Sequence, residues 1–210
     1  MSRLISIPYN CTDSELVGRV QDLLVEAFGD YRSYFALVRD LLADEGHTFL
    51  RGTDPVTPVA HIQVVDYIRR VEGKDYSIGY LYAVCTAEEY RKRGVMRTML
   101  PELLEEMKGQ GYHAAILVPA SKSLFGYYEA LGFIQEKGPI SLADTEPFGV
   151  QCDVVGDVIL PDLRARAYFA AEKSLSEESA EEAPLGWMSC SLLEDMPPFS
   201  SETILHSPLL

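Results

Sequence analysis

Four basic residues fall within seven positions of a chain whose formal net charge is −14: Arg91, Lys92, Arg93 and Arg97. Gly94 stands among them, where a strand-like segment ends and a helical pattern begins, and glycine permits the tight turn that this change requires. The first N–H groups of a helix have no carbonyl partner within it, so they can converge on an anion. A solvated basic turn is the alternative interpretation, but the strand before it and the apolar helix after it favour a phosphate site.

The composition narrows the class of protein. Hydrophobic residues make up 47% of the 210 residues and charged residues 24%, which is typical of one globular domain with at most an appendage. The longest apolar run, Ala114 to Ala120, is too short to span a bilayer, and the first residues do not form a signal peptide. The acidic balance argues against a nucleic-acid binder and suits either solubility or the recruitment of a cationic amine. We therefore expect neither a membrane nor a nucleic-acid partner.

The cysteines indicate a reducing compartment. Cys11, Cys85, Cys152 and Cys190 are scattered along the chain and form no C-x-x-C pair. A disulfide framework and a structural zinc site are therefore not expected, and no metal site is predicted. Reduced cysteines fit a cytoplasmic location.

Acidic residues gather toward the C-terminal end. Residues 161–210 contain nine acidic and three basic residues, which gives −6 of the −14 charges. We therefore divide the chain into a main domain, residues 1–160, and an acidic C-terminal helix and extension, residues 161–210. Three placements of the extension stay open: over an acceptor cleft, against a second copy of the chain in a homodimer, or free in solution.

Hydrophobic periodicity predicts the elements that must position these residues. In chain order they are helices over 15–28 and 31–42, strands over 47–51, 59–68 and 76–86, a helix over 94–108, a strand over 114–118, a helix from Ser121 or Ser123 to 131–132, a strand from Phe133, a strand over 150–160 and a helix over 161–174. Pro101 lies inside a predicted helix and should bend it. The remainder, from residue 184, is expected to be irregular or loosely docked. A β-hairpin ahead of a crossover helix implies a mixed α/β fold, in which the sheet is antiparallel at first, parallel afterwards, and flanked by helices.

Two motifs resemble those of the GNAT superfamily, the Gcn5-related N-acetyltransferases. The segment AVCTAEEYRKRGVM, residues 83–96, is similar to the family's strand followed by (Arg/Gln)-x-x-Gly-x-(Gly/Ala), with Arg91, Gly94 and Met96 at the motif positions. The segment YYEALGF, residues 127–133, is similar to the family's Tyr-x-x-x-Gly-Phe. A helix, a buried strand and a turn separate the two motifs, which is the family's order. The Arg-Lys-Arg-Gly-Val-Met variant most resembles the acetyltransferase domain of the enhanced-intracellular-survival type.

The resemblance implies an acetyl-coenzyme A-dependent N-acetyltransferase that acts on a primary amine of a small molecule or a protein. The pyrophosphate of this cosubstrate would bind the N–H groups of the turn and helix start, and its pantetheine arm would pair with the end of the preceding strand. A serine before the helix that ends at 131–132, Ser121 or Ser123, would add a contact with the cosubstrate, although it could equally cap that helix. The residues implied in cofactor binding are Val84, Cys85, Thr86, Arg91, Lys92, Arg93, Gly94, Val95, Met96, Arg97 and Ser121.

Tyr128 is the tyrosine of the second motif, and the resemblance implies that it protonates the departing thiolate. A phenol has an unperturbed pKa of about 10 and so stays protonated at neutral pH. The alternative for Tyr128 is a packing role. Its neighbour Tyr127 should point about 100° away around the helix, and we expect it to be a core or cofactor-lining residue. We assign no general base. His61 and Asp66 could each act as a base through a water molecule, but each could equally be an ordinary exposed residue of a strand.

Three further hypotheses stay open. The first is a non-catalytic acyl-coenzyme A-binding module of the same fold, and the second is an acyltransferase that uses a longer acyl chain. The third is acylation of Cys85, although a buried apolar role suits a cysteine with no histidine nearby in sequence. An acidic and aromatic cluster could attract a cationic amine acceptor, and its members are Asp30, Tyr31, Tyr34 and Phe35.

Overall fold

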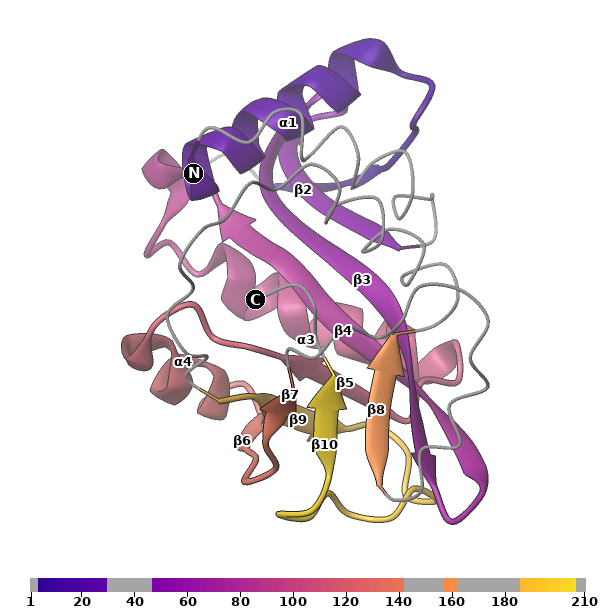
Figure 1. Ribbon diagram of the computed structural model, residues 1–210. Coiled ribbons are helices and arrows are strands. Elements are labelled where there is room, and N and C mark those ends of the chain that lie inside the picture. Colours follow the sequence, from indigo (N-terminus) through magenta and orange to yellow (C-terminus); the bar gives the residue numbers. More distant parts are fainter. Residues whose placement is uncertain (1–3, 30–46, 142–156, 162–185, 207–210) are drawn as a thin grey trace, which may run out of the picture. The chain divides into compact units, whose positions relative to one another are not determined.

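Residues 4–29, 47–141, 157–161 and 186–206 are described by the computed structural model of the chain (Figure 1). Predictions on other residues lie outside this part: the helices over 31–42 and 161–174, the start of the strand over 150–160, and the cluster from Asp30 to Phe35. The chain forms two compact units, one from residues 1–65 and 81–103, the other from residues 66–80 and 104–210. Three elements run through both: β3 (Thr57–Val71), β4 (Lys74–Thr86) and α3 (Val95–Gly109).

In the first unit, helix α1 (Ser14–Phe28) begins as the sequence predicts. Asp13 is its N-cap, and Asp13 Oδ1 accepts hydrogen bonds from the backbone N–H groups of Glu15 at 3.0 Å and Leu16 at 3.1 Å. Two of the N–H groups that a helix start leaves without partners are thereby satisfied. The apolar face of α1 packs against strand residues in one buried cluster, whose members are Ile7, Tyr9, Leu16, Val17, Val20, Leu23, Leu24, Leu50 and Cys85.

Two strands of the first unit precede the long hairpin. Strand β1 (Ile5–Pro8) pairs antiparallel with β2 (Thr48–Asp54), which in turn pairs antiparallel with β3. Strand β2 is longer than predicted because only residues 55–56 form the turn between β2 and β3. At this turn Asp54 Oδ1 accepts a hydrogen bond from Val56 N at 3.0 Å. Strand β1 was not predicted, since four residues ending in proline carry little signal of their own.

The predicted hairpin of β3 and β4 is confirmed, with a tighter turn than expected. Glu72 and Gly73 form it, with φ angles of 51° and 77°. Two positive φ values belong to the mirror-image turn whose twist matches that of the flanking strands. Residues 69–71 and 74–75, which lie between the two predicted strands, therefore continue the strands.

Around this hairpin the second unit builds a mixed sheet, as predicted. Strand β5 (Ala114–Leu117) runs parallel to β4, and β9 (Met188–Ser191) lies antiparallel between β5 and β6 (Ile134–Gln135). At the other side of the hairpin, β8 (Val158–Pro161) pairs antiparallel with β3. Strand β10 (Ile204–His206) pairs parallel with both β8 and β7 (Ile140–Ser141).

The prediction of an irregular chain from residue 184 is wrong. Strands β9 and β10 come from that segment, and their partners β5, β6, β7 and β8 all lie before residue 162. Short strands between prolines show no long periodic pattern, and pairing with distant strands stabilises them instead. The division of the chain at residue 160 stays a prediction.

The helical segments after the hairpin include one long helix and two short segments. Helix α3 continues through Pro101, and its buried residues are Val95, Met96, Met99, Leu100, Leu103, Leu104 and Met107. The predicted helix after Ser121 is split into a 3₁₀ turn, η2 (Lys122–Leu124), and a short helix, α4 (Phe125–Glu129). None of the helices in the described residues has the length and apolar character of a bilayer-spanning segment.

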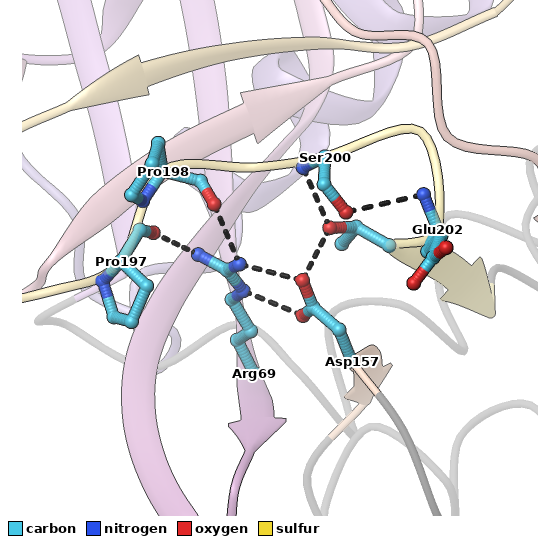
Figure 2. A network of polar contacts seen from close by, with 7 residues as sticks. Arg69, Asp157, Pro197, Pro198, Ser200 and Glu202 are labelled. Atoms are coloured by element: carbon cyan, nitrogen blue, oxygen red, sulfur yellow. Dashed lines mark hydrogen bonds and ion pairs between the residues drawn. The ribbon is translucent and has the colours of Figure 1, made fainter.

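A buried arginine joins three distant segments of the second unit (Figure 2). Arg69 of β3 is 1% exposed, and it donates to the two carboxylate oxygens of Asp157 at 2.8 and 2.7 Å. It also donates to the carbonyl oxygens of Pro197 and Pro198. The Arg69 guanidinium lies 4.4 Å from the centroid of the Phe199 ring, a cation–π contact. The segments before β8 and between β9 and β10 are thus fastened to β3.

Hydrogen bonds keep Asp157 ionised within this network. Burial alone would raise the pKa of its carboxyl group, but the hydrogen bonds from Arg69 and from the Thr203 hydroxyl outweigh burial and lower the pKa. Arg69 and Asp157 therefore form a charged pair in which hydrogen bonds compensate each group for its loss of water.

Candidate active site

The strand-to-helix turn lies in the first unit and joins β4 to α3. A single 3₁₀ turn, η1 (Glu88–Tyr90), follows the strand. Arg91 Nε then donates a hydrogen bond to the carbonyl oxygen of Thr86 at 3.0 Å. This hydrogen bond links the turn to the end of β4. Lys92 and Gly94 have φ angles of 60° and 79°, so the chain turns twice through the left-handed region before the helix begins. The structure therefore brings the predicted strand-end and turn residues together.

The first turn of α3 presents backbone N–H groups. Its first hydrogen bond runs from Thr98 N to Gly94 O at 3.2 Å, so the N–H groups of Val95, Met96 and Arg97 have no carbonyl partner within the helix. The side chains of Val95 and Met96 are buried, 7% and 9% exposed. These two residues can therefore offer an anion only their backbone, while their side chains anchor the turn in the core.

Positive charge surrounds these N–H groups. Arg91, Lys92, Arg93 and Arg97 are all exposed. The guanidinium of Arg93 lies 5.3 Å from the centroid of the Tyr90 ring, which restricts its position. Charged side chains and the positive end of the helix dipole add to the N–H groups, and together they suit a pyrophosphate.

Glu26 was missed at the sequence level, and it supports the turn. Its Oε1 accepts a hydrogen bond from the backbone N–H of Glu88 at 2.6 Å, so the end of α1 fixes the start of η1. No local pattern pairs these two glutamates, which lie 62 positions apart.

A backbone irregularity precedes the predicted pantetheine-binding residues. Ala83 has a φ of 48°, in the left-handed region that alanine seldom adopts. Just past the end of β4, Ala87 N donates to Val59 O of β3 at 2.9 Å. Val84 and Thr86 are half-buried and Cys85 is buried. Nothing in the sequence marks Ala83, since a positive φ is expected at glycine or asparagine.

The chemistry of Cys85 disfavours the hypothesis of an acylated cysteine. Burial raises the pKa of its thiol to about 12, against a smaller lowering effect of the Arg91 charge. The thiol is 8% exposed and packs with the apolar face of α1. Almost no nucleophilic thiolate exists at neutral pH.

We expect Cys85→Ala to retain turnover within about threefold, because a buried thiol of high pKa contributes only packing. The measurement is kcat for thiol release from acetyl-coenzyme A, with mass spectrometry of the wild-type protein after acetyl-coenzyme A treatment. Stoichiometric acetylation of Cys85, together with loss of turnover in the variant, would restore the acylated-cysteine hypothesis.

Tyr128 and Ser121 lie in the second unit. Tyr128 is 6% exposed, and its ring makes edge-to-face contacts with Tyr127 and Phe133 at centroid distances of 5.4 and 5.9 Å. Burial, followed by the influence of Tyr127, raises the pKa of Tyr128 to about 12. A phenol in this environment stays protonated at neutral pH, as a general acid must.

Ser121 occupies the N-cap position of η2, but its side chain makes no capping bond to the backbone. Its Oγ lies 2.9 Å from the Oγ of Ser123. A simple capping role therefore lacks support, and the predicted contact with the cosubstrate stays a prediction.

The two weighed bases differ from the exposed strand residues that the sequence suggests. Asp66 is half-buried, and its carboxylate accepts a hydrogen bond from the Tyr112 hydroxyl. His61 is 3% exposed, and burial lowers its pKa to about 4. At neutral pH the imidazole is therefore uncharged.

Comparisons with known proteins identify the family and the fold. A family model described as an acetyltransferase (GNAT) domain matches residues 11–135, more than half of the chain. No curated protein matches the chain. The crystal structure of a GNAT family N-acetyltransferase (YhbS) from Escherichia coli, in complex with CoA, covers 99% of this chain and 91% of its own. Its TM-score is 0.59 at 15% sequence identity.

Two further crystal structures share the fold over part of the chain. GCN5-related N-acetyltransferases from Anabaena variabilis and Kribbella flavida cover 64% and 65% of it, with TM-scores of 0.54 and 0.53 at 17% and 20% identity. This chain spans 32% and 34% of their lengths. At these identities the structures support the mixed α/β fold, and the family model carries the assignment of the family.

Proposed function

This chain belongs to the GNAT family of acetyltransferases, and from that premise we propose that it transfers an acetyl group from acetyl-coenzyme A to a primary amine. The acceptor is a small molecule or an amino group of a protein. The observation that carries the proposal is the family match over residues 11–135, which includes both motifs. The basic turn with its helix N–H groups supports binding of a pyrophosphate, and the CoA complex of the Escherichia coli relative supports an acyl-coenzyme A cosubstrate.

The proposed reaction needs three contributions from the chain. The nitrogen lone pair of the neutral amine attacks the thioester carbon, so a C–N bond forms as the C–S bond breaks. N–H groups at the strand end near Thr86 stabilise the negative charge on the carbonyl oxygen. Tyr128 gives its phenolic proton to the departing thiolate, the proton lost by the amine passes to solvent, and solvent returns a proton to Tyr128. The products are an amide and coenzyme A.

Thiol release from acyl-coenzyme A, measured across a panel of amines, tests the proposed activity. We expect release that depends on an amine and is fastest with acetyl-coenzyme A. Faster thiol release from a coenzyme A thioester with a longer acyl chain would favour an acyltransferase that uses longer chains. Binding of coenzyme A without release for any amine or amino-terminal peptide would favour a non-catalytic binding module.

The basic turn can be tested by removing two charges. Arg91→Ala with Arg93→Ala is expected to weaken coenzyme A binding at least about tenfold, because each charge-assisted contact to phosphate contributes about 1.5–3 kcal/mol before screening. Calorimetric Kd is the measurement. Lys108→Ala, at the far end of α3, removes a charge outside the turn and should leave Kd unchanged. Equal Kd values for the double variant and the wild type would exclude this site.

Within the family, we infer kinship with the enhanced-intracellular-survival type. The support is the variant Arg-Lys-Arg-Gly-Val-Met at residues 91–96.

A further inference from the structure

Ala83 holds a strained conformation at a position that matters for the proposed site. A φ of 48° is unfavourable for a residue with a Cβ atom, so the surrounding structure must maintain it. The residue directly precedes Val84–Thr86, the strand end proposed to pair with pantetheine. An irregular residue inside a strand changes the direction of those that follow. Whatever holds Ala83 therefore decides where Val84–Thr86 present their backbone groups.

His61, on the neighbouring strand β3, contacts Ala83 directly. Its Nδ1 lies 2.9 Å from the Ala83 carbonyl oxygen. A carbonyl only accepts hydrogen bonds, so Nδ1 carries the proton and donates, which fixes one tautomer of the ring. With 3% of His61 exposed, little room is left for water to replace this donor.

The backbone of His61 is held as firmly as its side chain. In the register of β2 and β3, His61 lies opposite Leu50, which is buried in the α1 cluster. Pairing with β2 therefore fixes the strand position from which the His61 side chain reaches Ala83.

We propose that His61 is a positioning residue for the acyl-coenzyme A site: its Nδ1–H holds Ala83 in the left-handed conformation and thereby aims the backbone of Val84–Thr86 at the pantetheine arm. This inference rests on the proposed function. His61 itself touches neither the cosubstrate nor the acceptor in this role.

Isothermal titration calorimetry with coenzyme A tests the role of the donor. His61→Leu removes the donor and should raise Kd about tenfold, the worth of one hydrogen bond to a buried carbonyl. His61→Asn places an amide nitrogen where Nδ1 lies and should keep Kd within about threefold of the wild type. If the leucine variant does not fold, His61→Gln takes its place. Its amide nitrogen lies one bond farther from Cα than Nδ1 does, so it should also fail to replace the donor and raise Kd about tenfold.

A second arm asks whether the effect passes through Ala83. Glycine adopts a φ of 48° without steric cost, so in an Ala83→Gly background the loss caused by His61→Leu should shrink below about threefold. A merely structural role would instead lower the binding stoichiometry at unchanged Kd. Unchanged Kd in His61→Leu, or a loss that neither asparagine nor Ala83→Gly reduces, would overturn the proposal.

The wild-type titration separates this inference from the proposed function. If wild-type protein binds no coenzyme A, the proposed function fails. If it binds and the His61 variants bind equally well, the positioning role alone is overturned.

Discussion

Replacing Tyr128 by phenylalanine is expected to lower turnover roughly 10²-fold or more while the affinity for coenzyme A barely changes. The phenol is needed only when the C–S bond breaks, so its removal acts on kcat and not on binding. Phenylalanine keeps the ring and with it the edge-to-face contact with Phe133, at a centroid distance of 5.9 Å. Turnover is measured by thiol release, and affinity by calorimetry.

The neighbouring tyrosine supplies the control. Tyr127→Phe also removes one hydroxyl from α4, but from a side chain that is 37% exposed. We expect its turnover to stay within about threefold of the wild type, since Tyr127 has no proposed part in proton transfer. Equal turnover of Tyr128→Phe and the wild type would remove Tyr128 from the catalytic residues.

The pH dependence of turnover adds a second test of the same residue. Burial raises the pKa of Tyr128 to about 12, and an acid must be protonated to act. Loss of its proton can therefore reduce kcat only as the pH approaches 12. A fall in kcat between about pH 8 and pH 10 that disappears in Tyr128→Phe would show a lower pKa than this environment implies.

Replacing Arg69 by methionine is expected to lower the free energy of unfolding by about 3–5 kcal/mol, because the half-buried Asp157 carboxylate loses its cation. The side chains of Arg69 and Asp157 are 1% and 15% exposed. The carbonyl groups of Pro197 and Pro198 lose a donor as well. Urea unfolding at pH 7 is the measurement. Because the pKa of Asp157 is held below its ordinary value in the fold, the stability that the charged carboxylate contributes is lost only as the pH falls through that lowered pKa, and the difference should narrow in acid.

Two further variants control this measurement. Arg70→Met breaks the exposed pair with Asp75, whose N–O distance is 2.7 Å, and should cost less than about 1 kcal/mol. Combining Arg69→Met with Asp157→Leu removes both buried charges and should restore much of the loss. If Arg69→Met costs no more than Arg70→Met, the network in Figure 2 does not stabilise the fold.

Local signals made much of the fold predictable. Asp13 and the apolar spacing after it place α1 within one residue of the predicted start. Gly94, between a strand pattern and a helix pattern, likewise marks the turn that forms the candidate anion site. In both segments the residues that decide the structure lie within a few positions of one another, so sequence spacing carries the information.

Distant partners explain what the sequence did not show. Arg69 lies just beyond the predicted strand over 59–68, and its carboxylate partner lies 88 positions away, before β8. Strand β9 is only four residues long, too short for its alternation to mark a strand, and it forms through pairing with β5 and β6. The positive φ of Ala83 and its contact with His61 likewise depend on how β3 and β4 meet, not on residue type.

Backbone amide shifts give the most direct test of the claim that the turn around Gly94 binds the pyrophosphate. We predict that titration of ¹⁵N-labelled protein with coenzyme A shifts the amide resonances of residues 91–97 most, with smaller shifts at 84–86. Binding of coenzyme A that leaves the resonances of Gly94, Val95 and Met96 unmoved would contradict the assignment of the site.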